Sequence, residues 1–378
     1  MGLKSAKQTP KTGPTAQQLL DFFNAKVNAV RQSTGNCPVQ TTLDSSPVVL
    51  DMFDECSRDE VRRTISSSQS KTCELDPLPT DVLKQFLPEL LPFITDMCNA
   101  SLQQGCLPLS QRRAVVTPRL KKSGLDEADV KNYRPISNLT FMSKIVERLV
   151  CRQLVTFLQK HNLLPTHQSA YRRQHSTETA VLKIVSDLLL ACDRGQVSLL
   201  ALLDLSAAFD TVDHSILIDR LQSAFGIRGP VIEWIHSFVT SRMQSVSFAG
   251  EKSTWSAIMC GVPQGSVLGP ILFLLYCADV TYIAHRHGVH AHSYADDTQL
   301  YVHCNAADCA IEAERLTACI EELDNWMTSN RLKLNADKTQ IIWIGTRQQL
   351  KKVVDADIVL NGHRNRSVAN CHVSWGQH

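Results

Sequence analysis

The chain has 378 residues, of which 43% are hydrophobic and 20% are charged, and its formal net charge is +2. These values are ordinary for a soluble globular protein and exclude a largely low-complexity chain, while so small a net charge does not by itself indicate a nucleic-acid-binding protein. The first 18 residues lack the apolar core of a signal peptide, and the longest apolar stretch, residues 271–277, is far shorter than the roughly 20 residues of a membrane span. The composition therefore predicts a soluble, intracellular protein with no membrane partner.

The 13 cysteines form no CxxC pair, and Cys304 and Cys309 lack a second pair of Cys or His ligands. This odd count and spacing favour reduced thiols over a disulfide framework or a zinc site. The histidines between residues 285 and 292 alternate along a predicted strand and need not converge. We expect no metal site there.

The first half of the chain shows mainly helical patterns. Residues 1–15 are rich in Lys, Thr and Pro and are expected to be disordered, and a helix is expected over 16–30. Ser57 and Glu60 form a capping box that opens a helix through residue 65. Helices are also expected over 81–86 and on to about 104, and residues 114–118 form a short strand before a basic loop.

The second half mixes helices with strands. Helices are expected at about 143–159 and 177–194, and the apolar run 197–203, which ends at Asp204, suits a strand buried on both faces. Asp213 is expected to cap a helix over 214–223. Further expected elements are paired strands within 246–259, a helix over 270–278, a hairpin of 290–294 and 298–303, a helix over 310–326, and strands at 333–334 and 340–344. Helices interleaved with a few strands predict an α+β domain.

A basic stripe lies between residues 112 and 134, a segment that contains seven Arg and Lys residues and only three acidic residues. Such a stripe can follow a phosphate backbone. Charge runs are more often solvated faces, so the stripe alone does not establish nucleic-acid binding.

Three carboxylates stand where the predicted strands end. Asp204 follows the buried strand, and Asp296 and Asp297 occupy the turn of the predicted hairpin. Adjacent carboxylates repel one another, so a turn that holds both commonly needs a cation. If strand and hairpin share a sheet, the cluster can hold two Mg²⁺ ions about 4 Å apart, an arrangement suited to in-line phosphoryl transfer.

A glycine-rich loop, residues 261–270, precedes the predicted apolar helix. Gly261, Gly265 and Gly269 allow another backbone or a nucleotide to approach closely, and Pro270 suits a first helical turn. Each of these features alone has an ordinary explanation as a turn, a cap or a loop. Their order along one chain makes coincidence the weaker explanation.

These segments resemble the motifs of non-LTR (LINE-type) retrotransposon reverse transcriptases. The similarity runs from about residue 55 to about 345 and is carried by residues 76–79 (DPLP), 133–137 (YRPIS), 204–210 with Asp213 and His214, 261–270, 294–297 (YADD) and 335–339 (NADKT). The resemblance implies a right-hand polymerase fold with fingers and palm, the palm being a small antiparallel sheet flanked by helices.

The resemblance also implies roles for individual residues. Asp204, Asp296 and Asp297 match the catalytic, metal-binding carboxylates, with the backbone carbonyl of Leu205 completing the coordination of two Mg²⁺ ions, or Mn²⁺ in their place. Phe209 matches the aromatic gate that excludes a ribose 2′-hydroxyl. Residues that match nucleotide-binding positions are Gln264, Arg134, Lys121 and Lys122, and Lys338 matches a catalytic lysine near the leaving pyrophosphate.

The loop residues Pro263, Gly265 and Ser266 match the part of the family that contacts template and primer. The partners implied are an RNA template, a DNA primer and dNTPs. Asp213 is interpreted as a helix cap, and His214 is given no catalytic role.

The implied organisation has four parts. An N-terminal extension covers 1–54, helices and fingers cover 55–200, the palm with part of the fingers covers 201–345, and a divergent tail covers 346–378; the reverse transcriptase domain spans about 105–345. Neither an endonuclease before residue 55 nor a thumb after residue 345 is recognised. This predicts a truncated element.

Two alternatives remain open. A retroelement relic would bind RNA without polymerising, because it lacks the apparatus that holds the primer. An RNA-dependent RNA polymerase usually has a second Asp five positions after the first, whereas Phe209 occupies that position here.

Overall fold

The computed structural model describes residues 13–35, 37–165, 168–170, 175–353, 358–360 and 363–365. Most of the segment predicted to be disordered, residues 1–12, lies outside them, as does the end of the predicted tail, residues 366–378. No helix in the described ranges is both long enough and apolar enough to cross a membrane.

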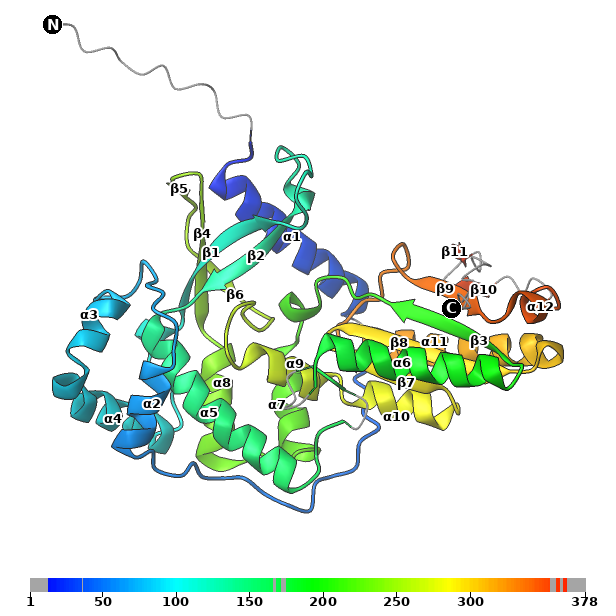
Figure 1. Ribbon diagram of the computed structural model, residues 1–378. Coiled ribbons are helices and arrows are strands. Elements are labelled where there is room, and N and C mark those ends of the chain that lie inside the picture. The colour runs from blue at the N-terminus through cyan, green and yellow to red at the C-terminus, as the bar shows by residue number, and fades with distance from the viewer. Residues whose placement is uncertain are drawn as a thin grey trace, which may run out of the picture.

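The carboxylates are carried by a four-stranded antiparallel sheet, ordered β7–β8–β3–β9. Its strands are β3 (Val197–Leu203), β7 (His290–Tyr294), β8 (Asp297–Cys304) and β9 (Gln340–Ile344). The central strand β3 is buried along nearly its whole length, as its continuous apolar sequence predicted. Helices α6 (Thr177–Asp193), α10 (Asp279–Arg286) and α11 (Cys309–Ser329) pack against this sheet (Figure 1).

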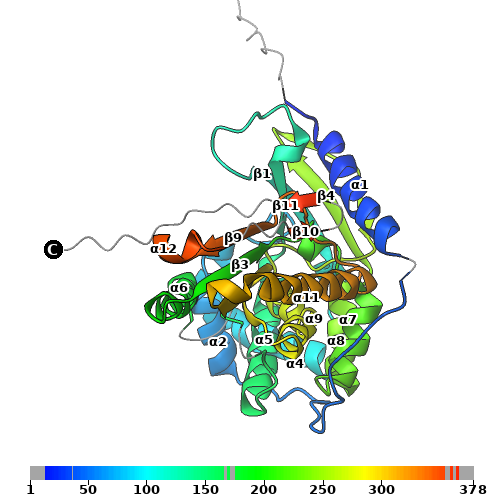
Figure 2. The same ribbon diagram turned by 90° about the vertical axis from the view of Figure 1, so that its right-hand side faces the viewer.

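A second sheet contains the basic stripe. It is ordered β2–β1–β4, with β5 and β6 also paired to β4, and β1 runs parallel to β4. Its strands are β1 (Arg113–Leu120), β2 (Tyr133–Asn138), β4 (Arg242–Phe248), β5 (Glu251–Lys252) and β6 (Ser256–Ile258). Helix α1 (Ala16–Thr34) lies along this sheet (Figure 2) and buries Leu20 and Phe23 against Val116 and Val246.

The main hydrophobic core joins the first sheet to a set of helices around Trp234, whose indole N–H donates to Ser101 Oγ at 3.0 Å. These helices are α2 (Arg58–Ser66), α3 (Thr80–Gln85), α4 (Leu87–Gln103), α5 (Phe141–Lys160), α7 (His214–Ser223), α8 (Gly229–Val239) and α9 (Gly269–Tyr276). Beyond β9 follow α12 (Arg347–Leu350), β10 (Ile358–Leu360) and β11 (His363–Asn365).

The segment between α1 and α2 runs along the helices of the main core (Figure 1). Ser46 N donates to Ser223 O at 2.9 Å, and Thr42 N donates to Asp279 Oδ1 at 2.6 Å. Asp279 and Arg220 form an ion pair of 3.0 Å whose side chains are 0% and 2% exposed. A buried ion pair anchors the N-terminal segment, so this segment is part of the folded body.

Capping residues in the sequence correctly predicted where two of the helices start. The capping box of Ser57 and Glu60 is present, and Asp213 accepts hydrogen bonds from the backbone N–H groups of Ser215 and Ile216 at the start of α7. Both predictions are confirmed.

Helix α8 and strand β2 are among the elements that had no predicted counterpart. Helix α8 is rich in aromatic and β-branched residues, whose intrinsic preference is for strands, and burial in the core overrides that preference. Strand β2 contains Pro135, which pairs with Pro118 on β1. Proline is tolerated here because β2 is an edge strand and β1 pairs with β4 only from Arg113 to Val116.

Candidate functional site

Asp204 lies at the end of β3, where the sheet register brings it to the β7–β8 hairpin. Leu203 is paired with Thr298, so the next position along the ladder sets Asp204 opposite Asp297. Asp204 is held from the other side by Asn335, whose side-chain amide donates to Oδ2 at 2.9 Å and whose backbone N–H donates to the Asp204 carbonyl at 2.8 Å.

Asp296 and Asp297 stand at a two-residue turn between β7 and β8. Tyr294 is paired with Asp297, and Ala295 has a positive φ of 57°. A tight turn of this kind fixes both carboxylates at the tip of the hairpin, beside the end of β3.

The three carboxylates are electrostatically coupled. Burial, and then the charge of Asp204, raise the pKa of Asp296, while Arg134 and Lys338 oppose the shift. Burial, then Asp296 and Asp204, raise the pKa of Asp297 against the same two cations. The charge of Asp204 therefore disfavours ionisation of both hairpin carboxylates, and the charge of Asp296 disfavours that of Asp297.

This donor set fits a hard divalent cation in its chemistry, because it consists of carboxylate oxygens whose mutual repulsion a cation relieves. Within the residues that the structure describes, no three Asp, Glu, His or Cys side chains already gather as a metal-ligand set. Lys338 Nζ instead lies 3.1 Å from Asp204 Oδ2. A lysine thus supplies positive charge at this position.

The glycine-rich loop is fastened to β2 and to the turn that follows β3. Ser137 N donates to the Gln264 carbonyl at 2.7 Å, and Gln264 Nε2 donates to Asp210 Oδ2 at 2.9 Å. Gly265 has a φ of 109°, and a Cβ there would lie 2.7 Å from Ser137 O. Glycine is required at this position by both conformation and space.

The other two loop residues shape the same turn. Ser266 Oγ donates to the Pro263 carbonyl at 2.8 Å and accepts from the Gly269 backbone N–H at 2.9 Å. Their visible contacts are within the loop.

Phe209 lies in the 3-10 turn Ala208–Asp210 after β3. Its partly buried ring stacks on Phe273 of α9, with ring centroids 4.6 Å apart and an interplanar angle of 30°. Its backbone carbonyl accepts from Val262 N at 2.8 Å, so the turn that carries the ring is tied to the glycine-rich loop.

The predicted basic residues are all exposed, and two of them, Arg134 and Lys338, act on the carboxylates. Arg134 is exposed on β2 and acts on the pKa of both hairpin carboxylates. Burial, followed by the charges of Lys26, Lys338 and Arg134, lowers the pKa of Lys121. Lys121 therefore shares a positive field with three other cations. Lys122 is exposed.

Sequence reasoning missed three residues of this neighbourhood. Asn335 lies in a recognised motif but was given no role, although it contacts Asp204. Asp210 was likewise given no role and contacts Gln264. Lys26 of α1 lies more than 170 residues before β3, and only the folded arrangement of α1 brings its charge near Asp210 and Lys121.

The histidines near the hairpin have separate partners. His287 Nε2 is 2.6 Å from Glu322 Oε2, and His292 Nε2 is 2.9 Å from Ser169 Oγ.

Comparison with known proteins agrees with this geometry. Residues 120–357 match the family model described as reverse transcriptase (RNA-dependent DNA polymerase). The chain is 29% identical over 317 residues to the RNA-directed DNA polymerase from mobile element jockey of Drosophila melanogaster, covering 82% of this chain and 33% of that protein. It is 30% identical over 228 residues to the probable RNA-directed DNA polymerase from transposon X-element of the same species, covering 60% of this chain and 25% of the relative.

The chain thus spans a third or less of the length of these relatives. The family model covers the β3 strand, the glycine-rich loop and the β7–β8 hairpin, and so includes all three carboxylates. This chain belongs to the reverse transcriptase (RNA-dependent DNA polymerase) family.

Proposed function

We propose that this chain carries out RNA-directed DNA synthesis for a non-LTR retroelement. A primer 3′-hydroxyl paired to an RNA template attacks the α-phosphate of a dNTP, and pyrophosphate leaves. The observation that carries the proposal is the register that sets Asp204 beside the Asp296–Asp297 turn, with coupled ionisation of the carboxylates. In this proposal the β7–β8–β3–β9 sheet is the palm, and the β2–β1–β4 sheet belongs to the fingers.

The carboxylates of Asp204, Asp296 and Asp297, with the carbonyl of Leu205, would hold two Mg²⁺ ions. When bound, the ions stabilise the negative charge that develops on the transferring phosphate. Burial and the neighbouring carboxylates raise the pKa values of Asp296 and Asp297, and this fits the role, since a cation removes the repulsion between the carboxylates.

The basic residues are assigned to the triphosphate. Arg134 projects from an exposed position of β2, and a guanidinium fork suits phosphate oxygens. Lys121 and Lys122 begin the loop after β1 and add positive charge. Lys338, beside Asp204, is assigned to the leaving pyrophosphate, where an ammonium group stabilises the departing charge and can donate a proton.

Phe209 and Gln264 are assigned to the nucleotide's sugar. The Phe209 ring is backed by Phe273, so it resists displacement by an added 2′-hydroxyl. Pro263, Gly265 and Ser266 continue from Gln264 along the loop and are assigned to template and primer contact.

Primer extension on an RNA template with Mg²⁺ and dNTPs tests the proposal. We expect extension by the unmodified chain and none by Asp296→Asn. Asp219→Asn, which removes an exposed carboxylate from α7, is the matched control and is expected to extend normally. RNA binding without extension by the unmodified chain would contradict the proposal and favour the relic that only binds RNA.

A further inference from the structure

Asp210 is a charged side chain close to the proposed nucleotide site that the mechanism above does not use. It lines a cavity of about 280 Å³ between α1, β2 and the glycine-rich loop. Its Oδ2 accepts a hydrogen bond from Gln264 Nε2 at 2.9 Å. Asp210 directly follows Phe209, so it belongs to the turn that carries the proposed sugar gate.

The turn and the loop are joined by their backbones as well. Gly261 N donates to Val212 O at 2.7 Å, and Val262 N donates to Phe209 O at 2.8 Å. A Cβ on Gly261, whose φ is 92°, would lie 2.7 Å from Asp210 O. The Asp210–Gln264 contact therefore joins two segments whose backbones are already hydrogen-bonded to each other.

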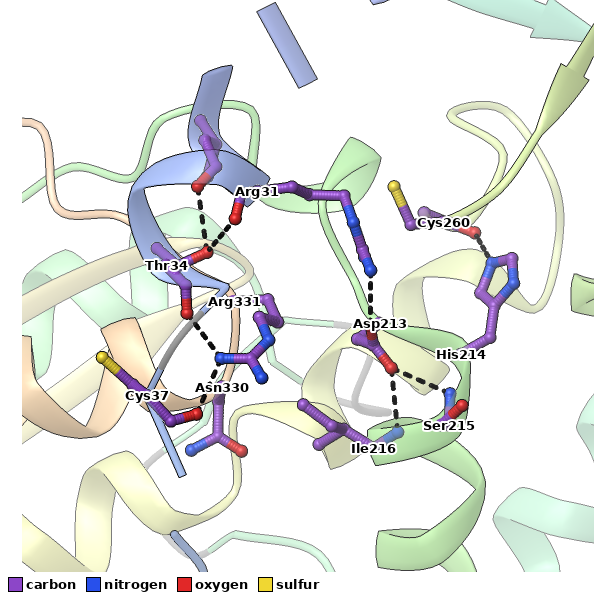
Figure 3. Close-up of polar contacts among 12 residues, drawn as sticks. Arg31, Thr34, Cys37, Asp213, His214, Ser215, Ile216, Cys260, Asn330 and Arg331 are labelled. Carbon is purple, nitrogen blue, oxygen red and sulfur yellow. Dashed lines mark hydrogen bonds and ion pairs between the residues drawn. The ribbon is translucent and has the colours of Figure 1, made fainter. Parts of the chain in front are cut away.

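Helix α7 and α1 brace the same pair of segments (Figure 3). His214 Nε2 lies 2.8 Å from the Gly261 carbonyl, and Asp213 Oδ2 accepts from Arg31 of α1 at 2.9 Å. Arg331 Nη1 in turn donates to the carbonyls of Thr34 and Cys37 at the end of α1, at 2.5 and 3.0 Å. These contacts hold in place the backbone segments that carry Asp210 and Gln264.

The chemistry of this contact fixes which way the Gln264 amide faces. An ionised carboxylate only accepts hydrogen bonds, so it selects the NH₂ group of Gln264 and turns the carbonyl Oε1 away. A protonated carboxyl also donates and permits the opposite orientation. The ionised form of Asp210 thus makes Gln264 present an acceptor to whatever lies on its other side.

We propose that Asp210 is a positioning residue for nucleotide binding, orienting the Gln264 amide so that Oε1 accepts from a hydroxyl of the incoming nucleotide's sugar. This inference rests on the proposed polymerase function. It gives Asp210 no contact with the nucleotide, because Asp210 acts through Gln264.

The surroundings of Asp210 set the pH range over which it acts. Burial raises its pKa to about 6, against opposing contributions from Lys26 of α1 and the Gln264 hydrogen bond. The other titratable groups that line the same cavity are Arg31 of α1, Tyr133 of β2 and Cys260, whose Sγ is 3.5 Å from Asp210 O. Because the pKa is raised, the orienting charge is present above about pH 6 and is lost as pH falls below it.

Steady-state kinetics with dNTP as the varied substrate test the role. For the unmodified chain we expect KM for dNTP to rise as pH falls from about 7.5 to 5.5. Asn can accept from Gln264 or donate to it, so Asp210→Asn should raise KM at neutral pH by roughly fivefold, the equivalent of one hydrogen bond of about 1 kcal/mol. Its kcat should stay near that of the unmodified chain, and its KM should no longer follow pH.

A charge swap provides the rescue. Gln264→Glu alone sets two carboxylates against each other and should impair dNTP binding severely. Combining it with Asp210→Asn lets the amide introduced at position 210 donate to one oxygen of the new carboxylate while the other oxygen faces the nucleotide. The double variant should therefore bind dNTP better than Gln264→Glu alone. No rescue, or a loss confined to kcat, would overturn the positioning role.

The side-chain amide resonance of Gln264 reports on the contact without any turnover. In NMR spectra of the full chain, this resonance is identified because it disappears in Gln264→Ala. Its chemical shift should change as pH passes about 6 in the unmodified chain and should not change in Asp210→Asn. A chain that extends no primer yet shows this titration contradicts the polymerase function and keeps the Asp210–Gln264 contact. An amide signal in the unmodified chain that does not respond to pH overturns the inference even if extension is normal.

Discussion

Lys338 Nζ lies 3.1 Å from Asp204 Oδ2, so the proposed metal-binding carboxylate is already paired with a cation. The Lys338 side chain is 67% exposed, so water and ions can replace Asp204 as its partner easily. A divalent cation bound as proposed would therefore compete with this lysine for the same oxygen.

Lys338→Met tests that competition. Without the ammonium group, the concentration of Mg²⁺ needed for half-maximal extension should fall, because Asp204 is free to bind metal. The rate at saturating Mg²⁺ should also fall, because the leaving group loses its cation. Lys333→Met removes another exposed lysine from the same loop as a control. Equal metal titrations for the two variants would remove Lys338 from the site.

The coupled carboxylates predict an unusual dependence of stability on pH. Asp296 and Asp297 have folded-state pKa values above the ordinary 3.8, so their ionised forms destabilise the folded chain, and this cost grows as pH rises through the raised values. In a chelator, Asp296→Asn should therefore melt at a higher temperature than the unmodified chain at pH 7.5, with the difference shrinking toward pH 4. Added Mg²⁺ should raise the melting temperature of the unmodified chain more than that of the variant. A variant that melts lower at every pH would show that Asp296 has a structural role instead.

Phe209→Ala tests the sugar gate. Removing the ring that stacks on Phe273 opens the space of a 2′-hydroxyl, and the preference for dNTP over NTP should fall by roughly 10- to 200-fold, the range for one apolar contact in a binding pocket. The measurement is the ratio of kcat/KM values for dNTP and NTP. Phe157→Leu on α5 is the control for general loosening of the core. Unchanged selectivity in Phe209→Ala would exclude the ring as the gate and reopen the possibility of an RNA-dependent RNA polymerase.

Two glycines with positive φ allow the cost of backbone strain to be measured apart from the cost of a steric clash. Gly250→Ala, with φ 84° and no atom near its added Cβ, should cost roughly 1–2 kcal/mol in the free energy of unfolding. Gly265→Ala meets the same kind of strain and also places Cβ 2.7 Å from Ser137 O, so it should cost more. It should additionally raise KM for dNTP, because the loop that carries Gln264 must move. Urea denaturation measures the change in the free energy of unfolding. An equal decrease for both variants would mean that the loop can move to accommodate the added Cβ without further cost.

The sequence predicted the elements whose signals are local. A capping box at Ser57, a cap at Asp213 and a continuous apolar run over β3 each depend on a few neighbouring residues, and all three are present. Helix α8 and strand β2 were missed because burial of Trp234 and its neighbours, and the opposed prolines 118 and 135, act through tertiary contacts.

The same distinction applies to the site. The three aspartates are marked by the places where strands end, which sequence can indicate. Partners that lie far away in the sequence cannot be found in that way. Asn335 reaches Asp204 across 131 positions, and Lys26, whose charge acts on Asp210, comes from a helix on the other sheet. Sequence reasoning therefore reached the carboxylates and the cations Arg134 and Lys338, but it missed Asn335, which holds Asp204, and Lys26.

The order β7–β8–β3–β9 has a consequence for synthesis of the chain on the ribosome. The apolar strand β3 emerges first, yet both strands that pair with it, β8 and β9, follow about a hundred residues or more later. Until then it exposes two unpaired edges, which is the condition that promotes intermolecular strand pairing. A product interrupted between residues 203 and 297 should therefore aggregate, whereas release of the complete sheet closes β3 on both sides.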